Sequence, residues 1–175
     1  MAHIFLSYSR RDGHYVDGLA AAIEQCGIRT WVDRRGIGGG EQWRSEIVAA
    51  IGRANALVLF LSPNSARSDN VRKELDLADG AGVRILPICI APTEIPSAWQ
   101  YQLAGMQFVE VWRDPDRAVE LIVKSLDRHG IKRSGAANSK PQTSPAAPGT
   151  DLNLAELGGA RIFDNFKLGR WFGRK

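Results

Sequence analysis

The first 133 residues alternate short apolar runs with amphipathic segments, and this alternation restricts the fold more than any other feature. Five runs have the length of strands: residues 4–6, 28–32, 56–61, 83–90 and 107–111. Strands that alternate with helices predict an α/β fold, a five-stranded parallel sheet with helices on both faces. Ala56 to Leu61 is apolar throughout, which is typical of a central strand covered on both faces.

Each predicted helix has a face of apolar residues at helical spacing. The first ends at Gly27, and the last is expected to be capped by Asp114 with Pro115 at its first position. The residues expected to face the sheet are Val16, Leu19, Ala20 and Ile23; Trp43, Ile47, Val48 and Ile51; Val71, Leu75 and Ala78; and Ala118, Leu121, Ile122 and Leu126.

The chain of 175 residues divides into a domain, a linker and a tail. Residues 1–133 are predicted to form the single domain. Residues 134–150 are rich in Ala, Pro, Ser, Gly and Thr and contain no aliphatic residue larger than alanine, which predicts a flexible, disordered linker. Residues 151–175 regain large apolar side chains, but too few for a core of their own.

The tail combines aromatic and basic residues, such as Phe163, Phe166, Arg170 and Trp171. We expect it to be a docking segment for a protein partner, because a flexible linker would hold a captured partner near the domain. Three alternatives stay open: the tail folds back on its own domain, lies at an anionic membrane surface, or is a terminus without a role.

Composition excludes several classes of protein. The chain is 44% hydrophobic and 24% charged, which is typical of a soluble globular protein, and its apolar runs are too short to cross a bilayer. The first strand begins at His3 and Ile4, which leaves no room for a signal peptide, so we expect a cytoplasmic protein. The net charge of +4 is too small to predict binding to nucleic acid. Two cysteines and three histidines without ligand spacing predict no metal site.

In a parallel sheet, ligands bind beyond the carboxyl ends of the strands. That rule selects the segments Ser7–Gly13, Asp33–Glu41 and Ser62–Asn70, together with Glu74 one helical turn later. Glu74 lies between two residues of a predicted buried face, so it is a candidate catalytic carboxylate at the border of a ligand site. The alternative is an ordinary surface glutamate beside Arg72 and Lys73.

The segment Gly36–Gly40 contains four glycines but lacks the Gly-Lys-Ser/Thr ending of a P-loop, and it follows the second strand, not the first. We interpret it as a loop that closes on a ligand or a neighbouring protein, or else as a long flexible connection. No Ser/His/Asp or Cys/His arrangement can be assigned.

Four blocks follow one another along the chain: Ile4–Ser9 with Asp12, Trp31–Asp33, the Gly-rich loop Gly36–Gly40, and Leu61–Ser65 leading to Arg72–Leu75. In this order they resemble a Toll/interleukin-1 receptor (TIR) domain of the bacterial type, over residues 1 to 130. The resemblance implies a flavodoxin-like sheet. Many members of this family cleave NAD at the nicotinamide–ribose bond, whereas others are adaptors that only bind further TIR domains.

The resemblance also implies roles for single residues. Glu74 matches the catalytic glutamate of the family, and Asp33 to Glu41 match the loop that gates the pocket and contacts the next subunit, which adds Gly36, Ile37 and Gly38 to the expected site. Phe5, Ser7 and Tyr8 match the strand edge that lines the nucleotide site. NAD would be a substrate, and no cofactor or metal is expected.

One residue departs from the family pattern. Many NAD-cleaving members have a tryptophan four positions before the glutamate, where this chain has Asn70; Trp43 or Tyr8 could replace the lost stacking contact.

We therefore hold three hypotheses about the function. The first is an NAD glycohydrolase or cyclase that acts as an effector or signal producer in bacterial-type immunity and depends on self-association. The second is a non-catalytic TIR adaptor, and the third is a deoxyribosyltransferase-type enzyme.

Overall fold

The sheet is parallel throughout and has the strand order β5-β4-β3-β1-β2-β6. The structure is a computed structural model, and it describes residues 3–33, 41–131 and 142–143. The strands are β1 (Ile4–Ser7), β2 (Thr30–Val32), β3 (Ala56–Leu61), β4 (Ile85–Cys89), β5 (Val109–Glu110) and β6 (Gln142–Thr143). Strand order reverses beside β1, which pairs with both β2 and β3.

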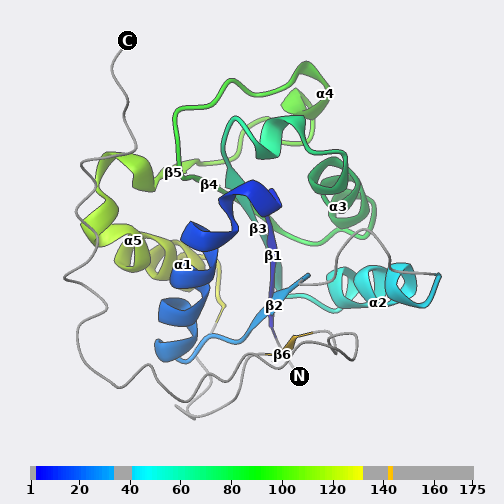
Figure 1. Cartoon of the computed structure of the whole chain (residues 1–175), viewed down its shortest axis with the longest axis horizontal. Coiled ribbons are helices and arrows are strands. Elements are labelled where there is room, and N and C mark those ends of the chain that lie inside the picture. Colours follow the sequence, from blue (N-terminus) through cyan, green and yellow to red (C-terminus); the bar gives the residue numbers. More distant parts are fainter. Residues whose placement is uncertain (1–2, 34–40, 132–141, 144–175) are drawn as a thin grey trace.

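Helices cover both faces of this sheet (Figure 1). One layer contains α1 (Gly13–Gln25) and α5 (Ala118–Arg128), and the other contains α2 (Glu41–Gly52) and α3 (Asp69–Gly80). The short helix α4 (Ser97–Gln100) lies on the α3 side, where Trp99 is buried. The predicted parallel α/β sheet with helices on both faces is therefore confirmed.

The strand period of two decides which layer each side chain of β1 meets. Ile4 and Leu6 belong to the core cluster under α1 and α5, whereas Phe5 belongs to the cluster under α2 and α3. Because alternate residues point to opposite faces, Ser7 falls on the α2 and α3 side. All six residues of β3 are buried, as a central strand requires.

Three expectations about the helices need correction. Val48 is 51% exposed, because α2 is turned so that Ile47, Ala50 and Ile51 face the core. In α5, Leu121 is only partly buried and Val123 is buried in its place. Asp114 makes no side-chain cap, since the chain passes through a short 3-10 turn at Pro115–Arg117 before α5 begins.

Most predicted strands are longer than the observed ones. The run 107–111 contributes only β5, because a 3-10 turn begins at Val111 and takes the chain away from the sheet edge. Similarly, β2 starts at Thr30 and not at residue 28.

The sixth strand belongs to the segment that the sequence predicts to be a linker. Gln142 and Thr143 pair in parallel with Trp31 and Val32. The other residues of 134–150, the tail 151–175, and Gly36, Ile37 and Gly38 lie outside the described residues. No helix among the described residues is long and apolar enough to span a membrane.

Candidate active site

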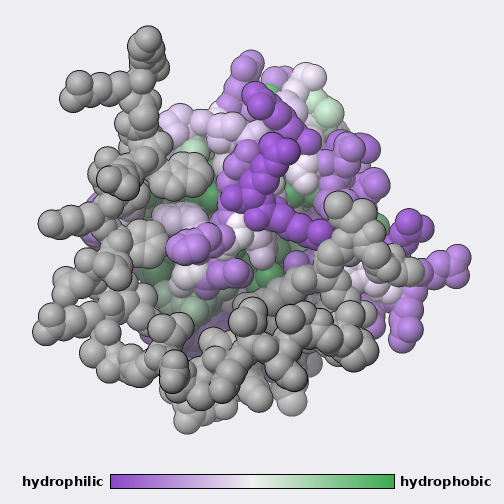
Figure 2. Space-filling model, in the orientation of Figure 1, coloured by the Kyte–Doolittle hydropathy of each residue, from purple (hydrophilic) through white to green (hydrophobic). Residues whose placement is uncertain are grey.

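The carboxyl ends of β1 and β2 and the start of α3 enclose a small recess with a volume of about 30 Å³. In the orientation of Figure 1, Figure 2 shows strongly hydrophilic side chains over the connection from β1 to α1, which forms part of this region. The recess is lined by Leu6, Tyr8, Arg10, Asp33, Ser68, Asn70 and Glu74. Its position is where the ligands of open parallel sheets bind.

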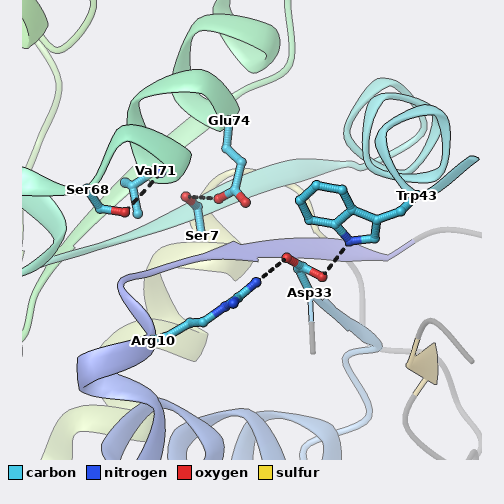
Figure 3. Close-up of polar contacts among 7 residues, drawn as sticks. All are labelled: Ser7, Arg10, Asp33, Trp43, Ser68, Val71 and Glu74. Atoms are coloured by element: carbon cyan, nitrogen blue, oxygen red, sulfur yellow. Dashed lines mark hydrogen bonds and ion pairs between the residues drawn. The ribbon is translucent and has the colours of Figure 1, made fainter. Parts of the chain in front are cut away.

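Glu74 reaches the recess from the buried face of α3. Its side chain lies beside Val71 and Leu75, and the residue is only 8% exposed. The hydroxyl of Ser7, at the end of β1, donates a hydrogen bond of 2.5 Å to Glu74 Oε2 (Figure 3). The interpretation of Glu74 as an ordinary surface residue is therefore wrong.

Burial raises the pKa of Glu74 from 4.5 to about 7. The hydrogen bond from Ser7 opposes this shift of the pKa, because it favours the charged carboxylate. The charge of Asp33 raises the pKa further, and the charge of Arg10 lowers it. Glu74 therefore exchanges its proton near neutral pH, as groups with electrostatic or acid–base roles in active sites often do.

The start of α3 is set by Ser68, whose hydroxyl accepts a hydrogen bond of 3.4 Å from the backbone N–H of Val71. Serine is a favoured N-cap residue because its oxygen satisfies an N–H group left free at the helix start. The helix consequently begins at the recess. Asn70 lies in its first turn and lines the recess, and Glu74 follows one turn later.

On the side of the recess formed by the end of β2, Asp33 interacts with two other elements. Trp43 of α2 donates its indole N–H to Asp33 Oδ1 over 3.0 Å, and Arg10 Nη2 lies 3.6 Å from Asp33 Oδ2. Figure 3 shows that the two side chains approach Asp33 from different sides. One carboxylate thus connects α2 with the 3-10 turn Arg10–Asp12 between β1 and α1.

A second carboxylate holds the loops at this edge together. Asp12 Oδ2 accepts a hydrogen bond of 2.6 Å from the hydroxyl of Ser62, and Asp12 Oδ1 accepts one of 2.6 Å from the side-chain amide of Asn64. The Ser62 oxygen also accepts from the backbone N–H groups of Asn64 and Ser65. We call Asp12, Ser62 and Asn64 the Asp12 cluster; it joins the connection after β1 to the connection after β3.

The structure brings together five of the residues expected at the site: Tyr8, Asp33, Asn70 and Glu74 line the recess, and Ser7 contacts Glu74. Trp43 reaches the recess only through Asp33. Phe5 does not line it, because its ring is fully buried and stacks on Trp31 with centroids 4.8 Å apart. Gly36, Ile37 and Gly38 are outside the described residues.

Arg10 and Ser68 lie inside the predicted segments Ser7–Gly13 and Ser62–Asn70, but the sequence did not single them out as site residues. Ser68 was recognisable in principle, since a serine directly before a predicted helix is an N-cap signal. Arg10 had no such signal, because in the sequence an arginine in a loop cannot be told from an ordinary solvated arginine.

Among residues 3–33, 41–131 and 142–143, no group of three or more His, Cys, Asp or Glu side chains is placed to hold a metal ion.

Comparison with known proteins places this site in context. A family model described as TIR domain matches residues 4–126. A search among curated proteins found no significant match to the sequence.

Two solved structures show the same fold. The TIR domain of the Toll-related receptor TRR-2 from Hydra magnipapillata is 24% identical, with a TM-score of 0.58, and the alignment covers 73% of this chain and 97% of that one. The heterodimer of the RPS4 and RRS1 TIR domains gives 15% identity and a TM-score of 0.53, covering 74% of this chain and 98% of that one. At these identities the likeness concerns the fold alone.

Proposed function

The chain belongs to the TIR domain family, and from this premise we propose that it cleaves NAD at the nicotinamide–ribose bond, as a glycohydrolase or a related cyclase. One observation carries the proposal: Glu74 is a buried carboxyl group at the recess, held by Ser7, with a pKa of about 7. A surface glutamate would have no such environment. In this proposal the protein is an effector or signal producer in bacterial-type immunity.

The chemistry that Glu74 would support follows from charge. When the C1′–N bond breaks, its electron pair leaves with nicotinamide, and positive charge develops on the ribosyl group. An ionised Glu74 attracts that charge more strongly than it would in water, because few dipoles in the buried setting screen it. Water, or a nucleophile within the substrate, then adds at C1′ to give the linear or the cyclic product. Ser7 would fix the carboxylate orientation.

The recess among the described residues holds about 30 Å³, whereas small-molecule sites commonly measure about 300–1,000 Å³. We therefore propose that the Gly-rich loop and a second copy of the chain complete the pocket. The crystallised RPS4 and RRS1 TIR domains form a heterodimer, so one TIR domain can bind another. Specific activity should then rise with protein concentration.

A non-catalytic adaptor is the second candidate function, and Asn70 favours it. Asn70 lines the recess at the position where many NAD-cleaving members of the family have tryptophan. An amide offers no comparable ring to stack on a substrate base, and such stacking contributes about 0.5–1.5 kcal/mol beyond area burial.

Release of nicotinamide from NAD by the purified full chain, over a range of protein concentrations, tests the enzyme against the adaptor. We expect cleavage that Glu74→Gln reduces by at least about 100-fold, the range of an electrostatic catalytic contribution. Glu24→Gln is the matched control, because Glu24 also accepts a hydrogen bond of 2.5 Å from a hydroxyl, that of Thr30, away from the recess. Equal activity in Glu74→Gln, or no cleavage by the concentrated wild-type chain, would contradict the proposal.

A further inference from the structure

Trp43 is a residue of the expected substrate site whose contacts indicate a different role. Its ring packs against the apolar cluster under α2 and α3, which includes Phe5 and Ile47, and it is not among the residues that line the recess. Its indole N–H nevertheless points at Asp33, which does line the recess (Figure 3). A ring that is packed in this way is a poor surface for a substrate base, but a rigid support for a hydrogen bond.

The two oxygens of the Asp33 carboxylate have different partners. Oδ1 accepts the indole N–H of Trp43 at 3.0 Å, and Oδ2 faces Arg10 at 3.6 Å. The indole N–H is a donor only, and its direction is set by the ring. This hydrogen bond restricts rotation of the carboxylate about its side-chain torsions, and with it the direction in which Oδ2 faces Arg10.

We propose that Trp43 is a positioning residue: its indole N–H holds the Asp33 carboxylate so that the Asp33–Arg10 ion pair faces Glu74 in one fixed arrangement. The importance of this arrangement to catalysis rests on the proposed function, but the interactions themselves involve only Trp43, Asp33, Arg10 and Glu74. Trp43 would set the electrostatic field at the carboxyl group and touch no substrate.

The other charged groups near Glu74 are placed less well than the Asp33–Arg10 ion pair to act on its carboxyl group. Arg72 and Lys73, on the same helix, are exposed, and Arg72 lies within 3.9 Å of Asp69 and 3.5 Å of Asp76. Tyr8 lines the recess from the end of β1. Among the groups that act on the pKa of Glu74, Asp33 raises it more than Arg10 lowers it. Loss of the fixed arrangement should therefore lower that pKa.

The test is an NMR titration of the Glu74 carboxyl carbon in the full chain, assigned by its absence in Glu74→Gln. Trp43→Phe keeps a ring in the apolar cluster and removes the N–H, and Asp33→Asn removes the charge. We expect both variants to have a Glu74 pKa below the wild-type value, with the larger decrease in Asp33→Asn. In the Asp33→Asn background, Trp43→Phe should cause no further change, which a merely structural effect of Trp43 would not reproduce.

Trp31→Phe is the matched control, since Trp31 stacks on Phe5 and preserves that contact as phenylalanine. It should leave the Glu74 pKa unchanged. An unchanged pKa in Trp43→Phe, or equal changes in both tryptophan variants, would overturn the inference. In the unmodified chain, the Trp43 indole proton should exchange with solvent more slowly than that of Trp112, and equal rates would also overturn it, even if Trp43→Phe failed to fold.

The titration uses no NAD. An inactive protein whose Glu74 pKa responds as expected would therefore overturn the proposed function and leave the positioning role standing. A protein that cleaves NAD, but whose Glu74 pKa does not change in Trp43→Phe, would support the proposed function and overturn the positioning role.

Discussion

Two carboxylates at the same edge of the sheet have opposite environments. Asp12 is partly exposed, and each of its oxygens accepts a side-chain hydrogen bond of 2.6 Å, from Ser62 and from Asn64. Glu74 is buried, and among the described residues it accepts one hydrogen bond, from Ser7. Asp12 has the partners that a structural carboxylate needs, whereas Glu74 has fewer than its burial requires.

This difference distinguishes a structural carboxylate, Asp12, from a candidate catalytic one, Glu74. A carboxylate whose two oxygens each accept a hydrogen bond from a neighbouring loop serves to hold those loops together. A buried carboxylate with one donor is costly for the folded protein, and a positive charge nearby would relieve that cost. The fold thus uses Asp12 to hold the edge of the sheet and keeps Glu74 available there.

The largest expected effect concerns the cost of burying Glu74. Its pKa is about 7 in the folded protein and 4.5 as the ordinary value, so the folded state binds more protons between these two values. The contribution of Glu74 to stability is therefore fully present below pH 4.5 and is lost as the pH rises through 7. Glu74→Gln cannot ionise, and its stability relative to wild type should increase by roughly 2–3 kcal/mol between pH 5 and pH 8.5.

Urea unfolding of the two proteins across this pH range measures the difference. Parallel stability curves for wild type and Glu74→Gln would show that Glu74 ionises as easily when folded as when unfolded. The contrast between the two carboxylates would then disappear.

Asp12→Ala should lower the stability of the folded protein, whereas Glu74→Gln should raise it. It removes the acceptor for the buried Ser62 hydroxyl and for the Asn64 amide, and hydrogen bonds to a charged group are worth about 1.5–3 kcal/mol. We expect a loss of about 2 kcal/mol in the free energy of unfolding at pH 7. A loss below about 0.5 kcal/mol, the size of an ordinary surface substitution, would show that the Asp12 cluster does not hold the edge.

Ser7→Ala sharpens the contrast by removing the donor to Glu74. Because that hydrogen bond lowers the pKa of Glu74, the variant should have a pKa above the wild-type value. A hydrogen bond to a charged group of roughly 1.5 kcal/mol, the lower end of that range, corresponds to a change of about one unit in the pKa measured by NMR titration. Ser45→Ala, which removes an exposed hydroxyl bonded to the backbone of Glu41, should leave the pKa unchanged. A pKa that falls in Ser7→Ala would contradict the assigned hydrogen bond.

Sequence patterns predicted the fold well and the site in part. The continuous apolar run of β3 and the helical spacing of Val71, Leu75 and Ala78 translate directly into buried elements. The end of β5 was not predictable in this way, because the turn at Val111 depends on how the chain leaves the sheet edge.

The burial of Glu74 could not be decided from its neighbours, since Arg72 and Lys73 beside it are exposed. What decides it is contact with Ser7, which is 67 positions away and meets α3 only through the topology of the sheet. Likewise, Trp43 has the residue type of a substrate platform. Its hydrogen bond to Asp33 depends on how α2 packs against the end of β2, which no spacing encodes.

The proposed cleavage of NAD requires that Glu74 be ionised. The most direct test is kcat/KM for nicotinamide release by the concentrated full chain between pH 5.5 and 8.5, because its pH dependence reports the pKa values of the free enzyme. We expect kcat/KM to rise with pH and to level off above a midpoint of about 7, the pKa of Glu74. A rate that is constant over this range, or one that falls as the pH rises through 7, would contradict it.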